Sequence, residues 1–333
     1  MRLRDRVKKY LPSYRTEERL NAKLDSIKRD IRELDHKQEY LYWLSQMQPG
    51  ETMQQTKERV FLRMPKATGR LRNIQIAENY ILQRVKDICD ANELPFFLIG
   101  GTLMGAVRHK GFIPWDNDID VGMIRKDFLK LKSILEQDEE LRLDYCYNYA
   151  AGLKVPKVKF RNFDAIFVDV FIFDYVDVGE DKPEQIWMES REYNRKYSEK
   201  LRELAKPYAG GQYLRPMENE ELDKALVVVE AEMEHSFGRS GRGEWFFEAL
   251  DSPYWARDPR GIMSAREHFP LQKDAVEFEG RMYDAWSNYD RALERMYGDI
   301  WQLPFSIGEP HTTEFDDGLE ETFAYLRQKG VLD

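Results

Sequence analysis

The sequence is short of three features that define large classes of proteins: cysteine, long apolar runs and an excess of positive charge. It holds only two cysteines, Cys89 and Cys146, which we interpret as buried free thiols in a reducing compartment rather than as a disulfide framework. No apolar stretch approaches the ~20 residues of a membrane-spanning helix, and the N-terminus lacks the apolar core of a signal peptide. The net charge of −9 argues against non-specific nucleic-acid binding. We therefore expect a soluble, cytoplasmic protein with no nucleic-acid partner.

Acidic residues are concentrated in the segment 115–121, which reads W-D-N-D-I-D-V. If the apolar run from Ile119 onward enters a β-strand, alternation places Asp118 and Asp120 on the same face. A third carboxylate, Asp169, interrupts the β-prone run 165–173 and needs a partner there. Like charges at one point repel unless a cation neutralises them, and an all-oxygen site favours Mg²⁺ or Mn²⁺. These three aspartates are the predicted metal ligands and catalytic residues, and Asp116 is a fourth candidate that could instead cap a turn.

A glycine pair lies upstream of the aspartates. The apolar run 96–99 predicts a buried strand that ends at Gly100 and Gly101, and Thr102 opens a helical stretch through Arg108. Glycine lets a phosphate approach the backbone, and the N–H groups at a helix start favour an anion. The sequence therefore predicts a phosphate-binding site next to the metal site.

Two groups of cations accompany this site. Arg108, His109 and Lys110 follow the predicted helix, and Lys159 and Arg161 belong to the segment 157–161, K-V-K-F-R, in which cations alternate with apolar residues. On one face of a strand these cations would bind the diphosphate of a donor. The alternative is a solvated strand face, which we weigh equally for Lys154 and Lys157. Without cysteine or a second histidine nearby, His109 is not expected to bind zinc.

With these residues in place, the chain resembles the LicD family of phosphotransferases, which have a nucleotidyltransferase-type fold. The resemblance is carried by G-G-T-L at 100–103 and by G-A-V-R-H-K-G-F-I-P-W-D-x-D-I-D at 105–120, and it extends from about residue 71 to 304. Shorter matches are the strand that contains Asp169, Phe278-Glu279-Gly280 and Tyr297-Gly298-Asp299. Ile300 departs from the aromatic residue more usual after the last motif, and the surroundings of His311 do not align, so acceptor recognition is left open.

The resemblance implies transfer of an alcohol phosphate, such as phosphocholine, from a CDP-linked donor to a hydroxyl of a cell-surface glycan, a lipid-linked glycan or teichoic acid. It identifies Asp118 and Asp120 as metal-binding residues and Asp169 as the third acid. We expect catalysis by positioning and charge neutralisation, with Asp169 as the candidate acceptor of the hydroxyl proton. Two alternatives remain: a nucleotidyltransferase that moves a nucleoside monophosphate to a small acceptor, and a non-catalytic coiled-coil scaffold.

The first 68 residues differ from the rest. Leu20, Leu24, Ile27, Ile31, Leu34 and Leu41 are separated by alternating steps of four and three, with Gln38 in the remaining seam position. This pattern predicts either a coiled-coil homodimer or an amphipathic helix packed on its own catalytic domain, and residues 49–50, Pro-Gly, end it. The basic stretch within residues 1–15 could contact the inner face of the plasma membrane; a solvated terminal helix is the alternative.

Residues 69–333 are predicted to form one α+β catalytic domain, a nucleotidyltransferase-like mixed sheet flanked by helices, with a helical insertion at about 180–270. We expect helices at 72–92, 125–137, 182–204, 219–237, 283–296 and 319–328. Six aromatic residues of the insertion could form a cage for a quaternary ammonium group or simply pack in the core: Trp187, Tyr193, Tyr197, Trp245, Phe246 and Phe247.

Overall fold

The computed structural model describes residues 12–148, 153–176, 183–208, 213–214, 219–233, 239–240, 245–248, 262–264, 271–303 and 318–333. Contacts divide the chain into two units. The first is residues 1–63 with 301–307, and the second is residues 64–300 with 308–333. The boundary lies a few residues before the expected one at 68. In the described part of the chain, no helix combines the length and the apolar character needed to cross a membrane.

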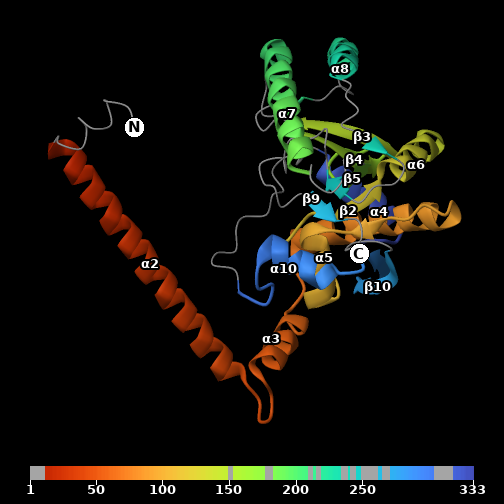
Figure 1. The fold of residues 1–333 in the computed structure, drawn as a ribbon. Coiled ribbons are helices and arrows are strands. Elements are labelled where there is room, and N and C mark those ends of the chain that lie inside the picture. Colours follow the sequence, from red (N-terminus) through yellow and green to blue (C-terminus); the bar gives the residue numbers. More distant parts are fainter. Residues whose placement is uncertain are drawn as a thin grey trace. The chain divides into compact units, whose positions relative to one another are not determined.

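The first unit is built on the long helix α2 (Pro12–Gln46), which is followed by the short helix α3 (Met53–Leu62) (Figure 1). A capping box between Thr52 and Gln55 starts α3. Trp43 of α2 is buried and packs on Phe61 of α3, with the ring centroids 5.8 Å apart. The predicted apolar seam from Leu20 to Leu41 lies on α2, and its six side chains are between 44% and 64% exposed.

The second unit is organised around a mixed β-sheet, as expected for an α+β fold. Its main path runs β1 (Phe97–Leu98), β2 (Asp120–Ile124), β5 (Phe167–Val176), β4 (Leu153–Phe160), β3 (Leu141–Asn148) and β6 (Tyr213–Leu214). Strands β2 and β5 pair in parallel, and their neighbours on this path pair antiparallel. The parallel pair places the carboxylate-bearing strands of the predicted site side by side.

Helix α4 (Gly69–Ala91) packs its apolar face on this sheet. The residues expected on that face, Ile74, Ile81, Val85 and Ile88, are all buried in the main core. Helices α5 (Gly100–His109), α6 (Arg125–Gln137) and α11 (Leu319–Gln328) complete the core layer. The bounds of α6 and α11 agree with the prediction, because both helices carry a regular apolar stripe.

The expected helix at 283–296 was wrong in its first half. Residues 281–285 form β11 (Arg281–Ala285), which pairs with β10 (Gln272–Phe278), and helix α10 begins only at Tyr289 and ends at Tyr297. Glu279 and Gly280 make the turn of this hairpin, and both have positive φ angles of 47° and 81°. Alternating burial of Tyr283 and Ala285 favours the strand, since both face the core.

The insertion is not purely helical either. Helix α7 (Pro183–Ala205) is followed by the 3-10 turn at Lys206–Tyr208 and by α8 (Glu220–Glu232); part of the predicted continuation of α8 to residue 237 lies outside the described residues. Strands β7 (Arg239–Ser240) and β8 (Trp245–Glu248) pair with β5, and β9 (Ile262–Ser264) pairs with β8. The insertion therefore extends the sheet.

The six aromatic residues of the insertion are divided among three clusters rather than gathered in one cage. Phe246 stacks on Phe173 with ring centroids 4.8 Å apart, and Tyr197 packs with Leu201 and Leu222. Phe247, Trp187, Tyr193 and Trp245 pack around Val176 and Ile186. Core packing is thus the observed role for Tyr197, Phe246 and Phe247.

Two expectations concern other parts of the chain. Cys89 is a buried free thiol, as predicted, whereas Cys146 is only half-buried. The N-terminal residues 1–11, the Ala-Gly-Gly at 209–211 and His311 lie outside the described residues. Membrane contact through the N-terminal segment therefore stays a prediction.

Candidate active site

Asp120 and Asp169 face each other across the parallel strands β2 and β5. The two residues are direct partners in the register, and the backbone N–H of Asp169 donates to the carbonyl of Ile119 over 2.8 Å. Residues in this relation project on the same face of a sheet about 5 Å apart. Burial, followed by the charges of Asp118 and Asp169, raises the pKa of Asp120 well above its ordinary value.

Asp116 and Asp118 lie in the loop that leads into β2. The side chain of Asp116 lies within hydrogen-bonding reach of that of Asp118. Burial and then the charge of Asp118 raise the pKa of Asp116 to about 8. Gln75, buried on α4, holds this loop by donating to the carbonyl of Asp116 over 2.8 Å. The loop therefore brings two more carboxylates to the ends of β2 and β5.

Glu78 is a fifth carboxylate that sequence reasoning missed. It lies on α4 with 3% of its surface exposed, and its Oε2 is buried without a hydrogen-bond partner among the described residues. Its pKa is raised by burial and then by Asp118, Asp116 and Asp169. The available signal was its spacing: residues 74, 78, 81 and 85 form one helical stripe, so Glu78 is an acid in an otherwise apolar row.

The two glycines make room for these carboxylates. A Cβ on Gly100 would lie 2.8 Å from Oδ2 of Asp120, and one on Gly101 would lie 3.0 Å from Oδ2 of Asp116. Gly100 also has a φ of +56°, which L side chains rarely adopt. The first turn of α5 thus lies against two aspartates. Thr102 fixes one of them, since its Oγ1 accepts the backbone N–H of Asp120 over 2.8 Å.

Lys157 is the cation that lies in the carboxylate cluster. Its Nζ donates to Oδ1 of Asp169 over 2.6 Å, and the lysine is 5% exposed. Burial raises the pKa of Asp169, and the charge and hydrogen bond of Lys157 oppose that rise. Lys157 lies two residues before the predicted Lys159 on the same face of β4, so the sequence pattern had identified the correct strand face.

Lys159 and Arg161 have other neighbours. The ammonium of Lys159 lies 3.3 Å from both Asp144 and Asp164, and its charge also reaches Asp169. Arg161 follows the end of β4, and its guanidinium donates to the carbonyls of Leu135, Asp138 and Leu141. It therefore connects the C-terminal end of α6 to the start of β3. Its predicted contact with a diphosphate stays a prediction.

The cations at the end of α5 also separate. Arg108 is buried, donates to the carbonyl of Ile300 over 2.7 Å and is close enough to Asp116 to interact electrostatically. Burial lowers the pKa of Arg108 to about 10, and Asp116 partly offsets this. His109 packs edge-on against Trp115, and Lys110 adopts a left-handed conformation at the exposed end of the helix. Arg108 therefore links the end of α5 electrostatically to Asp116.

The C-terminal motifs support this site. Glu279 accepts from Arg72 and Lys66 over 2.7 and 2.8 Å, and its N–H donates to the carbonyl of Lys110. It thereby joins the β10–β11 turn to α4 and to the end of α5. The Tyr297 hydroxyl lies 3.6 Å from the position of a Cβ on Gly100, so the third motif reaches the start of α5.

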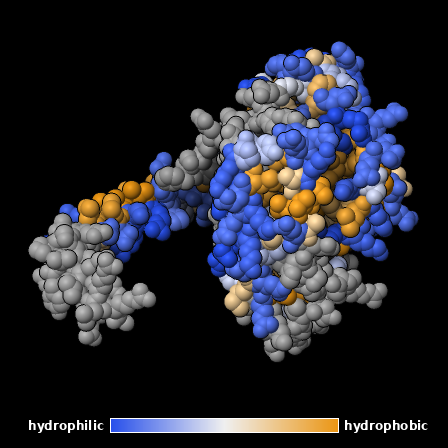
Figure 2. Space-filling model, turned by 90° about the horizontal axis from the view of Figure 1, so that it is seen from above, coloured by the Kyte–Doolittle hydropathy of each residue, from blue (hydrophilic) through white to orange (hydrophobic). Residues whose placement is uncertain are grey.

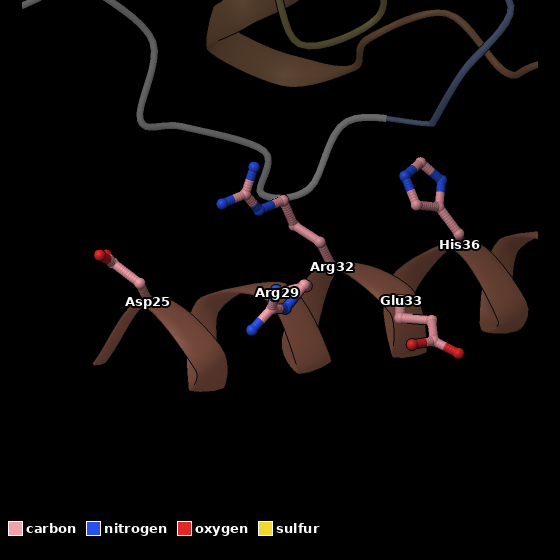
Figure 3. Close-up of a pocket in the computed structure, with 5 residues that line it drawn as sticks. All are labelled: Asp25, Arg29, Arg32, Glu33 and His36. Atoms are coloured by element: carbon pink, nitrogen blue, oxygen red, sulfur yellow. The ribbon is translucent and has the colours of Figure 1, made fainter. Parts of the chain in front are cut away.

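The donor set suits a hard divalent cation, because it consists of buried carboxylate oxygens that repel one another and includes an unpartnered Oε2 on Glu78. As the side chains are placed, no three His, Cys, Asp or Glu groups in the described ranges are close enough together to hold an ion. A separate pocket lies along α2 (Figure 3) and is lined by Asp25, Arg29, Arg32, Glu33 and His36, none of which belongs to the carboxylate cluster.

The strand β1, the glycine turn that begins α5, and the aspartates of β2 and β5 all lie between residues 97 and 176. Residues 93–213 match the model of the LicD/FKTN/FKRP nucleotidyltransferase domain. The chain is 28% identical over 260 residues to the lipopolysaccharide cholinephosphotransferase LicD of Haemophilus influenzae, covering 70% of this chain and 92% of that protein. An uncharacterized protein of Rickettsia prowazekii is 34% identical over 73 residues, covering 22% of this chain and 27% of that protein.

Proposed function

We propose that this enzyme transfers an alcohol phosphate, phosphocholine or a related aminoalcohol or polyol phosphate, from a CDP-linked donor to a hydroxyl of a cell-surface glycan. The Haemophilus relative makes lipopolysaccharide the first acceptor to test, and teichoic acid and lipid-linked glycans follow. The single observation that carries the proposal is a group of electrostatically interacting acids, two of which, Asp116 and Asp120, lie against the first turn of α5; the others are Asp118, Asp169 and Glu78.

A divalent cation fits the proposal because a phosphate alone would be repelled at this place. The first turn of α5 favours an anion, yet Asp116 and Asp120 already lie against it. Asp118, Asp120 and Asp169 would hold Mg²⁺ or Mn²⁺, with Asp116 as a further candidate ligand. Such an ion supplies charge neutralisation for the diphosphate and its leaving nucleotide.

The protein's own groups have separable roles in this proposal. Thr102 and Gln75 orient Asp120 and the 116–118 loop through the hydrogen bonds described above. The ammonium of Lys157 favours the ionised form of Asp169, which suits Asp169 to accept the proton of the attacking hydroxyl. Arg108 and Lys159 add positive charge near the carboxylates. Catalysis then rests on positioning and electrostatics.

The test is calorimetric binding of CDP-choline, CDP-ethanolamine, CDP-ribitol and CDP-glycerol, with and without Mg²⁺, followed by product analysis with lipopolysaccharide. We expect Mg²⁺-dependent binding of one donor, release of CMP and transfer of that donor's alcohol phosphate to a glycan hydroxyl. Asp118→Ala should abolish binding. Asp87→Asn is the matched control, since Asp87 pairs with Arg281 on the outer side of α4. Binding of nucleoside triphosphates instead, with release of pyrophosphate, would favour transfer of a nucleoside monophosphate and contradict the proposal.

A further inference from the structure

Helix α2 carries an apolar strip that its own unit leaves uncovered. Leu20, Leu34 and Leu41 are 58%, 64% and 64% exposed, and the strip continues through Leu24, Ile27 and Ile31. Part of this strip is visible along the helix in Figure 2. Its residues are spaced by alternating steps of four and three over a helix roughly 50 Å long. Such a seam is buried most completely by another helix with the same period.

The opposite face of α2 is the one that the unit uses. Residues 25, 29, 32, 36, 39 and 43 form a second row with the same spacing. Within this row, Trp43 packs on Phe61 and donates to Glu39, which also accepts the N–H of Leu303. The remaining members line the pocket of Figure 3. The seam therefore points away from the contacts made within the unit and is left for a partner.

We propose that the partner is a second copy of this chain and that the two α2 helices pair antiparallel. Both the orientation and the choice of partner follow from the charges that flank the seam. On one flank these are Lys23, Asp30 and Lys37, each directly before a seam residue. On the other flank they are Lys28 and Asp35, each directly after one.

A parallel pair in register would bring like charges together. In that arrangement a flanking residue meets the residue five positions later on the partner's other flank. Lys23 would meet the partner's Lys28, and Asp30 would meet the partner's Asp35, each contact occurring twice by symmetry. Only Gln38 favours this arrangement, because it would face its own copy and could hydrogen-bond to it.

An antiparallel pair brings each flank against the same flank of the partner. The first flank alternates in sign, so a stagger exists that sets Asp30 against the partner's Lys37. The second flank then sets Lys28 against the partner's Asp35. Every charged contact becomes attractive, and the apolar residues still face one another. By connectivity, the C-terminal ends of the two helices, which lead to the catalytic units, lie at opposite ends of the pair.

The first experiment measures the mass of the full-length protein by light scattering and sedimentation equilibrium. We expect twice the chain mass of 39.6 kDa. Asp30→Lys should weaken the antiparallel dimer at least about tenfold, equivalent to about 1.4 kcal/mol, because it creates lysine–lysine contacts. The same substitution would strengthen a parallel dimer by pairing Lys with Asp35. Asp25→Lys on the opposite face is the matched control and should leave the dimer unchanged.

A charge swap checks that these effects come from pairing rather than from loss of helix. Lys28→Asp alone should weaken the dimer, and Lys28→Asp with Asp35→Lys should restore it, while circular dichroism confirms equal helix content. A monomer across the micromolar range, a tighter dimer for Asp30→Lys, or equal weakening by Asp25→Lys would each overturn the proposal.

Cysteine crosslinking tests the orientation directly. Chains with Leu24→Cys should not crosslink to one another under oxidation, since position 24 meets its own copy only in a parallel pair. Mixed with chains that carry Leu41→Cys they should crosslink, because position 24 meets position 41 in the stagger that pairs Asp30 with Lys37. Mixed with chains that carry Leu34→Cys they should not, because that contact would set Asp30 against the partner's Asp30. The unsubstituted chain gives the background from Cys89 and Cys146. Efficient crosslinking of Leu24→Cys alone would overturn the antiparallel arrangement.

Discussion

Asp120 and Asp169 lie directly beside each other in the parallel pairing of β2 with β5, and burial raises the pKa of both carboxyl groups. Two carboxylates in this relation are unfavourable without a cation. We expect Asp120→Asn to lower turnover at least about a hundredfold, because removing residues that only orient metal ligands already costs about 10- to 100-fold. The fold should persist, since the substitution removes repulsion.

The measurement is steady-state turnover together with thermal unfolding in EDTA and in Mg²⁺. Wild-type protein should gain stability on adding Mg²⁺, and Asp120→Asn should gain little. An active variant, or one that responds to Mg²⁺ as the wild type does, would remove Asp120 from the proposed metal site.

Glu78→Gln should show whether Glu78 contributes to Mg²⁺ binding although its burial among other acids destabilises the fold. Glu78 is buried and interacts most strongly with Asp118, so its neutral amide relieves repulsion and the EDTA-treated variant should melt no lower than wild type. Removing a charge that orients or supplements the ligands should weaken Mg²⁺ binding about 10- to 100-fold. Titration calorimetry with Mg²⁺ provides the affinity. Unchanged affinity with reduced stability would mean that Glu78 serves only the packing of α4.

Gly100→Ala tests the contact between α5 and Asp120. At φ of +56° an alanine costs about 1–2 kcal/mol of stability, and its Cβ would lie 2.8 Å from the Asp120 carboxylate. Gly280→Ala is the matched control, because Gly280 has a φ of +81° and nothing within 4 Å of an added Cβ. Chemical denaturation should show similar losses for both variants, while activity should fall only for Gly100→Ala. Equal activity in the two would show that this close approach has no role.

Lys157→Met should be strongly destabilising, because it leaves Asp169 buried without its ammonium partner. Breaking a buried pair of this kind costs about 3–5 kcal/mol. The double variant Lys157→Met with Asp169→Asn should recover most of that stability but not the activity. A double-mutant cycle by denaturation measures the coupling, and strictly additive losses would indicate that the pair contributes little in solution.

Glu279 predicts a dependence of stability on pH. Burial alone would raise its pKa, but the hydrogen bonds from Arg72 and Lys66 outweigh burial and lower the pKa below the ordinary value of 4.5. A lowered pKa stabilises the fold above the unfolded value, and this contribution is lost as pH falls through the folded pKa. The free energy of unfolding of the wild type should therefore exceed that of Glu279→Gln by about 2 kcal/mol near neutral pH. This difference should shrink below pH 4.5. Glu277→Gln on the adjoining strand β10 is the control; a difference independent of pH would contradict this assignment.

Local sequence patterns correctly predicted those elements whose own residues show a regular apolar spacing or a turn motif. Helices α6 and α11 and the apolar face of α4 follow from helical periodicity, and the glycine turn before Asp118 and Asp120 follows from the order of residues between 96 and 123. The prediction failed where partners far along the chain decide the outcome. Residues 281–285 form a strand because β10 is available to pair with them, and the aromatic residues of the insertion are divided among three clusters by the sheet they join.

For the candidate site, the sequence by itself determined which acids are present and the order of the glycine turn and the aspartates along the chain. Only the tertiary structure set Asp120 beside Asp169 and placed Lys157 rather than Arg161 at the carboxylate of Asp169. It also brought Glu78 close enough to the aspartates to interact with them electrostatically. The physical reason is that alternation and helical period fix the face on which a side chain lies. The groups that occupy the opposite face come from other parts of the chain, and packing alone brings them there.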